Sequence, residues 1–380
     1  MKKAKTSKVP SLPLDIVVKV VFYIGEWYNV VAFLEALRPR KMLGPLEHLW
    51  QLHLMAWKAP DLWPLLDLTD SGQAFKVHLE GIVKLYSKVL VNLTTDVAWF
   101  RQIALPTVAV HWTCTHLRSK SRPFVDLNTI NQWKNFQIVS IDKEAVNPKL
   151  VFETLSCLEY LSEISWQFSE HEMAVALFQY AASSSSLRKL DLESVATCIF
   201  FSSSVTTTMS TSMANDLLTW VVSQPVQFIS MKGYMWENND LRQQIVTSAL
   251  EKPTLERFVM EEINASKWKI LGKFNRRKKL ALLEFSGPRD GGYEGLDLDK
   301  LRGFIKGFRP ILVDDIETLY ILGIKYVGHC NIWPTLAPLL KQSKVKILIM
   351  ECGKMEGSEA NEVAEVLCHL PALQKLESAV

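Results

Sequence analysis

The sequence lacks the features that mark a nucleic-acid-binding or membrane-spanning protein. The formal net charge of the 380 residues is only +3, and the basic residues are scattered, so no basic stripe offers a nucleic-acid footprint. The most apolar stretch, residues 16–37, contains Lys19, Glu26 and Glu35, and burying these charges in a bilayer would cost several kcal/mol. We therefore expect no nucleic-acid partner and no membrane partner.

Cysteine is also scarce. The six cysteines include no Cys-x-x-Cys pair, which favours free thiols in a reducing compartment over a disulfide framework. Asp15 and Lys19 interrupt the first apolar run, and no small-residue cleavage site follows it, so we expect no secretory signal. A cytoplasmic or nuclear location is the resulting expectation.

Motifs for catalysis and cofactor binding are missing as well. The sequence has no phosphate loop, no Gly-x-Gly-x-x-Gly and no Gly-x-Ser-x-Gly. The best metal-like cluster, His111 with Cys114 and His116, has no second ligand pair at zinc spacing, which favours packing roles for these side chains. We expect no catalytic residue, no metal and no cofactor; the alternative is an enzyme whose site follows no known motif.

A repeated apolar pattern fills the second half of the chain. The pattern has apolar residues at its first, fourth and sixth positions, as expected for a short strand with one buried face. Five of the seven distances between successive copies lie between 25 and 29 residues, within the period of leucine-rich repeats. The copies are at residues 161–166, 187–192, 226–231, 255–260, 280–285, 319–324 and 345–350, with a truncated one at 373–376.

The segments between these copies have helical spacing and end in the same way. Ser169 to Glu172 spells a capping box, and apolar residues follow it at helical intervals. Pro225, Pro253 and Pro371 each end such a segment just before the next predicted strand, because proline disrupts a helix interior and favours extended geometry before it. Strands and helices are thus predicted to alternate.

Residues 136–380 resemble the ribonuclease-inhibitor-like class of leucine-rich-repeat proteins. The segment Glu251 to Leu255, followed by Phe258 and Met260, is similar to that family's junction between helix and strand. The resemblance implies an α/β solenoid with a curved parallel sheet on its concave face. The family's asparagine after the strand is irregular here, and Ser202–Ser212 and Gly287–Gly295 are interpreted as flexible insertions.

Within such strands, the residues that alternate with the apolar ones would face outward and form a surface for a protein partner. The alternative for each of these residues is that it is only exposed to solvent and binds no partner. The predicted partner-binding residues are Glu163, Ser165, Lys189, Asp191, Phe228, Ser230, Arg257, Glu284 and Lys375.

Residues 11–50 resemble an F-box. They open with Leu-Pro-Leu-Asp-Ile at residues 12–16 and close with Leu46, Leu49 and Trp50, with helical spacing between. The segment Val31–Leu37 stands where the family has a Cys-x-x-x-Trp or Cys-x-x-Trp motif. The resemblance implies docking on the Skp-type adaptor of cullin ubiquitin ligases, through the residues Leu12, Pro13, Leu14, Ile16, Val20, Ile24 and Trp50.

The whole sequence is therefore interpreted as a helical module at residues 11–50, an aromatic-rich helical connector at 51–135 and a repeat solenoid at 136–380. The predicted function is the substrate-recognition subunit of a Skp–cullin–F-box-type ligase, with an unidentified target protein. The alternative is a repeat scaffold without a ligase link, in which residues 12–50 only cap the open end of the solenoid.

Overall fold

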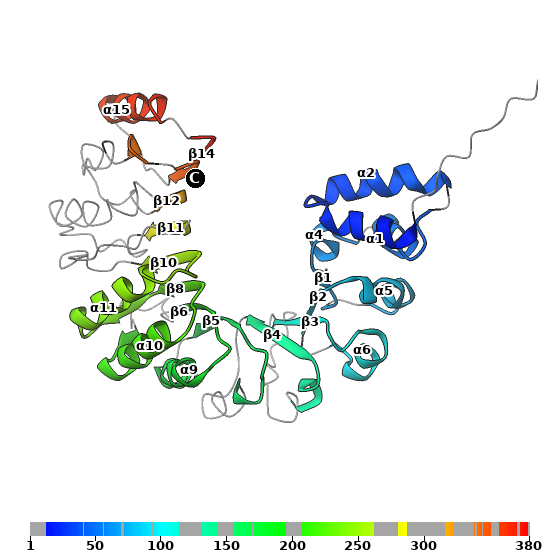
Figure 1. Ribbon diagram of the computed structural model, residues 1–380, viewed down its shortest axis with the longest axis horizontal. Coiled ribbons are helices and arrows are strands. Elements are labelled where there is room, and N and C mark those ends of the chain that lie inside the picture. The colour runs from blue at the N-terminus through cyan, green and yellow to red at the C-terminus, as the bar shows by residue number, and fades with distance from the viewer. Residues whose placement is uncertain are drawn as a thin grey trace, which may run out of the picture. The chain divides into compact units, whose positions relative to one another are not determined.

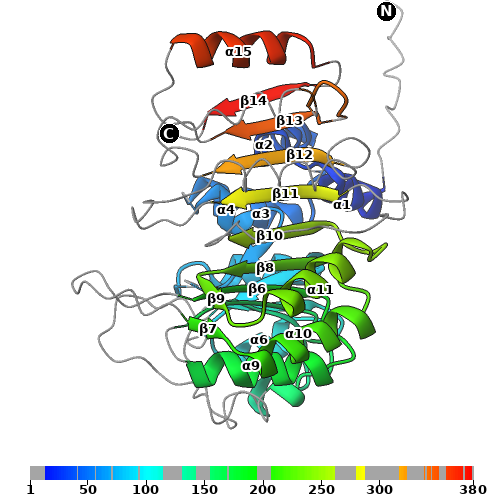
Figure 2. The same ribbon diagram turned by 90° about the vertical axis from the view of Figure 1, so that its left-hand side faces the viewer.

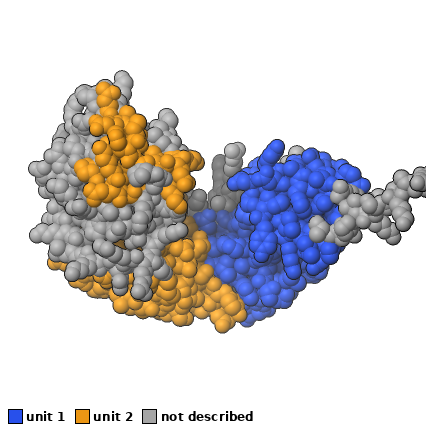
Figure 3. Space-filling model, turned by 45° about the horizontal axis from the view of Figure 1, so that its top comes forward, with its two compact units in different colours: residues 1–142 blue, residues 143–380 orange. Residues whose placement is uncertain are grey.

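The computed structural model describes much of the chain, which divides into two compact units, Met1–Asp142 and Lys143–Val380 (Figure 3). The described residues are 13–40, 42–55, 57–69, 72–92, 95–113, 131–142, 155–168, 171–194, 207–261, 280–286, 316–322, 338, 340–343, 345–350, 357–370 and 373–378.

Unit 1 begins with three helices and a 3-10 turn, so the predicted N-terminal helical region is present. Pro13 precedes α1 and Asp15 lies in its first turn, where a negative charge stabilises the helix dipole. Val17 and Val21 on α1 are fully buried, so this helix has an inner apolar side. The elements are α1 (Leu14–Tyr23), α2 (Trp27–Leu37), η1 (Arg38–Arg40) and α3 (Leu46–Leu54) (Figure 1).

The rest of unit 1 is α/β rather than helical. Residues 51–135, predicted to be a helical connector, contain three strands, and a fourth follows at Gln137–Asp142. The four pair in parallel in chain order. The apolar triplet of the second half also occurs here, at residues 63–68, 86–91, 105–110 and 133–138, but aromatic residues occupy several of its positions and the prediction missed it. The elements are α4 (Ala59–Leu62), β1 (Leu66–Asp67), α5 (Lys76–Ile82), η2 (Val83–Leu85), β2 (Lys88–Val91), α6 (Val97–Ile103), β3 (Ala109–Thr113) and β4 (Gln137–Asp142).

Buried polar groups line the ends of these strands. Asn92 directly follows β2 and is 5% exposed; its Nδ2 donates to the backbone oxygen of Thr69 at 3.1 Å. Its side-chain oxygen accepts from Thr95 Oγ1, also at 3.1 Å. A buried amide that satisfies a neighbouring turn fixes the spacing between successive strands.

Unit 2 contains a parallel sheet of eight strands that pair in chain order, β5-β6-β8-β10-β11-β12-β13-β14 (Figure 2). Each of the eight predicted triplets overlaps one of these strands. The elements are β5 (Glu163–Phe168), α9 (His171–Ser183), β6 (Lys189–Ser194), β7 (Thr207–Met209), α10 (Thr211–Ser223), β8 (Phe228–Lys232), β9 (Tyr234–Trp236), α11 (Asn239–Leu250), β10 (Arg257–Glu261), β11 (Leu280–Ser286), β12 (Ile316–Leu322), β13 (Ile347–Met350), α15 (Gly357–Cys368) and β14 (Lys375–Ser378).

The core of unit 2 lies between the strands and the helices α9, α10 and α11, which lie on one side of the sheet (Figure 1). Leu190 and Leu192 on β6 are fully buried, and so are Phe178 on α9 and Trp220 on α10. The Trp220 indole donates to the backbone oxygen of Leu187 at 3.2 Å. Full burial of one such side chain contributes about 1.5–3 kcal/mol, so this apolar interface is a major stabilising feature of the unit.

The predicted flexible insertion at Ser202–Ser212 is ordered where the structure describes it. Thr207–Met209 form β7, which pairs in parallel with β9. Ser210 then caps α10, since its side chain accepts a hydrogen bond from the backbone N–H of Met213 at 3.3 Å. A serine of this segment therefore caps the start of helix α10. The other predicted insertion, Gly287–Gly295, lies outside the described residues.

No helix among the described residues is long and apolar enough to cross a membrane.

Candidate interaction surfaces

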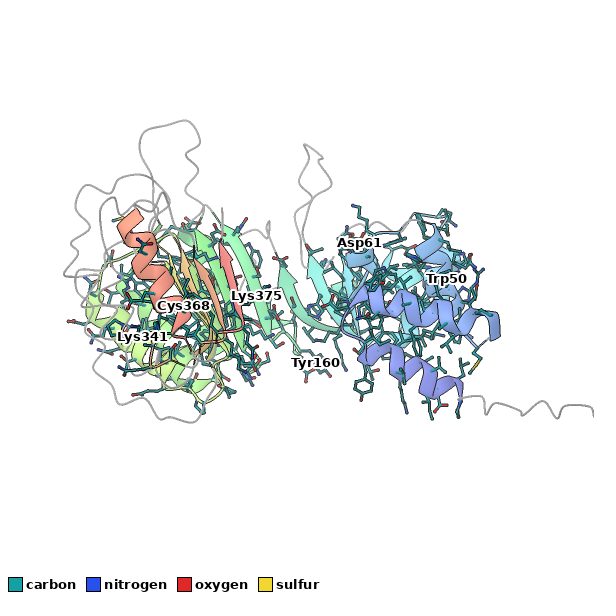
Figure 4. All side chains as sticks on the ribbon, turned by 90° about the horizontal axis from the view of Figure 1, so that it is seen from above. Trp50, Asp61, Tyr160, Lys341, Cys368 and Lys375 are labelled. Atoms are coloured by element: carbon teal, nitrogen blue, oxygen red, sulfur yellow. The ribbon has the colours of Figure 1, made fainter. Side chains whose placement is uncertain are left out.

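The predicted partner-binding residues of unit 2 lie in register on one face of its sheet. Ile164, Leu190 and Ile229 occupy matching positions and are fully buried, so the residues that alternate with them point away from the helices. We call this side of the sheet the open face. Figure 4 shows Lys375 on strand β14, within this sheet.

Three rows of strand positions cross the open face. The first row, named the edge row, contains Glu163, Lys189, Phe228 and Arg257 and continues through Leu282, Thr318 and Ile347 to Lys375. The second, named the middle row, contains Ser165, Asp191, Ser230, Val259 and Glu284. The third contains Gln167, Glu193 and Lys232. Because neighbouring parallel strands lie about 4.8 Å apart, successive positions of a row are close together.

Several side chains of the open face contact each other. Lys189 Nζ lies 3.3 Å from Glu163 Oε2, and their side chains are 37% and 33% exposed. In the third row, Gln167 Nε2 donates to Glu193 Oε2 at 2.9 Å. The Arg257 guanidinium carbon lies 4.8 Å from the centroid of the Phe228 ring. The alternation in the sequence placed these residues on one face, but it did not indicate these three contacts.

The prediction that Ser230 contacts a partner is wrong. Ser230 is 1% exposed, although it lies on the open face. Its short side chain sits between Phe228 and Lys232 on the same strand, so longer neighbours shield it from solvent. Ser165 and Asp191 in the same row are half-buried, and the side chain of Glu284 lies outside the described residues.

The outer side of α1 carries apolar side chains that the fold leaves uncovered. Ile16 is 41% exposed, Val20 is 38% exposed and Tyr23 is 90% exposed. Their spacing of four and three residues places them on one face of the helix. We call these three residues the α1 strip. Tyr28, at the start of α2, is also 81% exposed; like Tyr23, it was not among the predicted contact residues.

The other predicted adaptor contacts have different positions. Pro13 and Leu14 are exposed at the start of α1, and the Leu14 side chain lies against Gly44, whose φ of 52° favours glycine. Ile24 is half-buried, and its backbone oxygen accepts from the Trp63 indole at 2.9 Å. Leu12 lies outside the described residues.

Trp50 is a correction to the prediction. The residue is 5% exposed and lies on α3, with its ring close to the Arg38 guanidinium at 5.3 Å (Figure 4). Leu46 and Leu49 on the same helix are buried as well, so Trp50 belongs to the inner apolar side of α3. Its side chain stabilises the helical module and presents no contact surface.

Aromatic contacts and a histidine pair hold the helical module within unit 1. The Phe22 ring lies 4.9 Å from that of Trp63 and 5.0 Å from that of Tyr86. The buried Tyr86 hydroxyl donates to the backbone oxygen of Leu62 at 2.7 Å, and burial raises the pKa of Tyr86 well above its usual value. Between α3 and α5, His48 Nδ1 and His78 Nδ1 lie 3.2 Å apart.

Groups suited to metal or acid–base chemistry are sparse in the described part of the chain. No group of three or more His, Cys, Asp or Glu residues could hold a metal ion there; His111 lies in β3, and Cys114 and His116 lie outside the described residues. Burial lowers the pKa of Arg242 to about 9, and its guanidinium lies 5.7 Å from the Trp236 ring centroid. Desolvation in the core, rather than an acid–base partner, causes this shift.

Comparison with known proteins returned no match, either among family models or among curated proteins.

Proposed function

We propose that the protein is a non-enzymatic adaptor that binds one partner through its N-terminal helices and another through the open face of unit 2. In this proposal the first partner is the Skp-type adaptor of a cullin ubiquitin ligase, and the second is a target protein for ubiquitination. Binding would raise the effective concentration of the target near the ligase, so no chemistry is required of this chain.

The α1 strip is the observation that carries the proposal. Val17 and Val21 fill the inner side of α1. Packing within unit 1 therefore does not explain the apolar residues on its outer side, which are Ile16, Val20 and Tyr23. Full burial of side chains of this size contributes about 1.5–3 kcal/mol each, so their exposed parts together offer several kcal/mol to a partner. Two residues of the strip, Ile16 and Val20, are also among the adaptor contacts that the resemblance to an F-box implies.

The strands support the second half of the proposal. Sequential parallel strands with helices on one side are features of leucine-rich-repeat solenoids, which bind proteins with their concave sheet. We infer that unit 2 is such a repeat array.

A repeat scaffold without a ligase link is the second candidate. Trp63 donates to Ile24, and Trp50 is buried within the module, so α1–α3 also cover apolar surface of unit 1 as a terminal cap would. This function predicts the same inner contacts, but it gives no role to the α1 strip.

The two candidates differ in one binding experiment. The purified full chain is mixed with a purified Skp-type adaptor and analysed by size-exclusion chromatography with light scattering. A one-to-one complex supports the ligase function. Two separate peaks would instead support the repeat scaffold without a ligase link, provided that circular dichroism shows the chain to be folded.

A further inference from the structure

The open face of unit 2 pairs some of its charged groups internally, but Arg257 stays available to a partner. Lys189 is paired with Glu163, and Glu193 accepts a hydrogen bond from Gln167. Arg257 is exposed and forms no ion pair with any residue that the structure describes. Its guanidinium has five N–H donors and no acceptor. When a partner excludes water from this face, the partner must supply oxygen acceptors for these N–H groups.

Phe228 restricts the position of this cation. The guanidinium carbon of Arg257 lies 4.8 Å from the ring centroid, a distance typical of a cation–π contact. The contact restricts the conformations of the Arg257 side chain in the unbound protein, so less side-chain entropy is lost on binding. Phe228 is itself half-buried, so part of its ring stays available to an apolar group of the partner.

The surroundings of Arg257 within the edge row are short of negative charge. Phe228 lies between Lys189 and Arg257 in register, and the next position beyond Arg257 is Leu282. Glu163 is the one acidic side chain among the edge-row positions from β5 to β10, and Lys189 already neutralises it. Ser230, next to Phe228 in the middle row, is buried and presents no competing group.

We infer that the partner of this face carries an Asp or Glu carboxylate beside an apolar side chain, the carboxylate binding Arg257 and the apolar group contacting Phe228. This inference rests on the proposed function of the open face as the target-binding surface. Arginine is well suited to the role because its planar guanidinium can bind both oxygens of a carboxylate. Arg257 is the only arginine among the described positions of the three rows, and one guanidinium matches one carboxylate, whereas recognition of phosphate groups generally uses clusters of arginines.

Selection from a library of random 12-residue peptides tests the inference on the immobilised full chain. Selected peptides should be enriched in Asp or Glu next to aromatic or aliphatic residues. Selection on Arg257→Glu should instead enrich Lys or Arg at that position, and selection on Phe228→Ala should lose the apolar neighbour. A peptide selected by the native chain should bind Arg257→Gln about 10- to 100-fold more weakly, as expected for loss of a charge-assisted hydrogen bond.

Lys341→Glu is the control variant, because Lys341 is exposed and lies outside the strands that form the open face. It makes the same reversal from a basic to an acidic residue, so it should retain the peptides chosen by the native chain. Circular dichroism of each variant checks the fold. Peptides without acidic residues, an acidic preference that survives Arg257→Glu, or no enrichment at all would overturn the inference. The Skp-type adaptor is absent from this selection, so failure of the ligase function would not affect its outcome.

Discussion

Replacement of Ile16 by aspartate tests the adaptor-docking surface most directly. Ile16 is 41% exposed on the outer side of α1, so the substitution removes little from the core. If an adaptor covers the α1 strip, the exposed part of Ile16 contributes about 1 kcal/mol to binding, which is this fraction of the 1.5–3 kcal/mol for full burial. Burial of an unpaired carboxylate costs more than the lost apolar contact, so the total loss should reach about 3 kcal/mol or more.

A loss of that size weakens binding at least about 100-fold. Isothermal titration calorimetry of the purified full-length variant with a Skp-type adaptor measures it. Val77→Asp is the matched control, since Val77 is 66% exposed on α5 and lies outside the strip. The midpoint of thermal unfolding should stay within a few degrees of the native value for both variants, since surface substitutions usually change stability by less than about 0.5 kcal/mol. Native-like binding by Ile16→Asp, or an equal loss in Val77→Asp, would refute the assignment of the surface.

Three further predictions concern stability. Tyr86→Phe should cost about 1–3 kcal/mol in urea unfolding, because the buried oxygen of Leu62 loses its donor. Burial raises the pKa of Tyr86 in the folded state, so the native protein loses stability as pH rises above the ordinary tyrosine range near 10, and Tyr86→Phe should reduce this loss in unfolding titrations from pH 8 to 11. Asn92→Ala should lower the free energy of unfolding by about 1–3 kcal/mol, since the oxygen of Thr69 is left without the Asn92 donor; an unchanged urea midpoint would contradict the structural role of this amide. Gly81→Ala should lower the melting temperature because its Cβ would collide with the His48 ring, whereas the same change in a His48→Ala background should raise it, since alanine favours a helix by about 1 kcal/mol over glycine.

Periodic patterns of apolar residues predicted those parts of the fold in which each element has one buried side. Copies of one apolar triplet located the strands of unit 2, because alternate residues of a strand face opposite sides of the sheet. Pro225 and Pro253 marked the ends of α10 and α11, which stop at Ser223 and Leu250. The same alternation predicted that Glu163, Lys189, Phe228 and Arg257 face one side of the sheet, and the strand pairing shows that they also lie in one row.

Features that depend on neighbours distant in the sequence became evident only in the folded protein. The strands of residues 51–135 were not predicted, although the apolar triplet occurs at residues 63–68, 86–91 and 105–110, and each of these strands pairs with a strand about twenty residues away. Longer side chains cover Ser230, and other parts of the helical module cover Trp50. A periodic pattern predicts which face a residue lies on, but not whether neighbouring side chains cover it. The cation–π contact between Arg257 and Phe228 likewise depends on the register of β8 and β10, which no local pattern specifies.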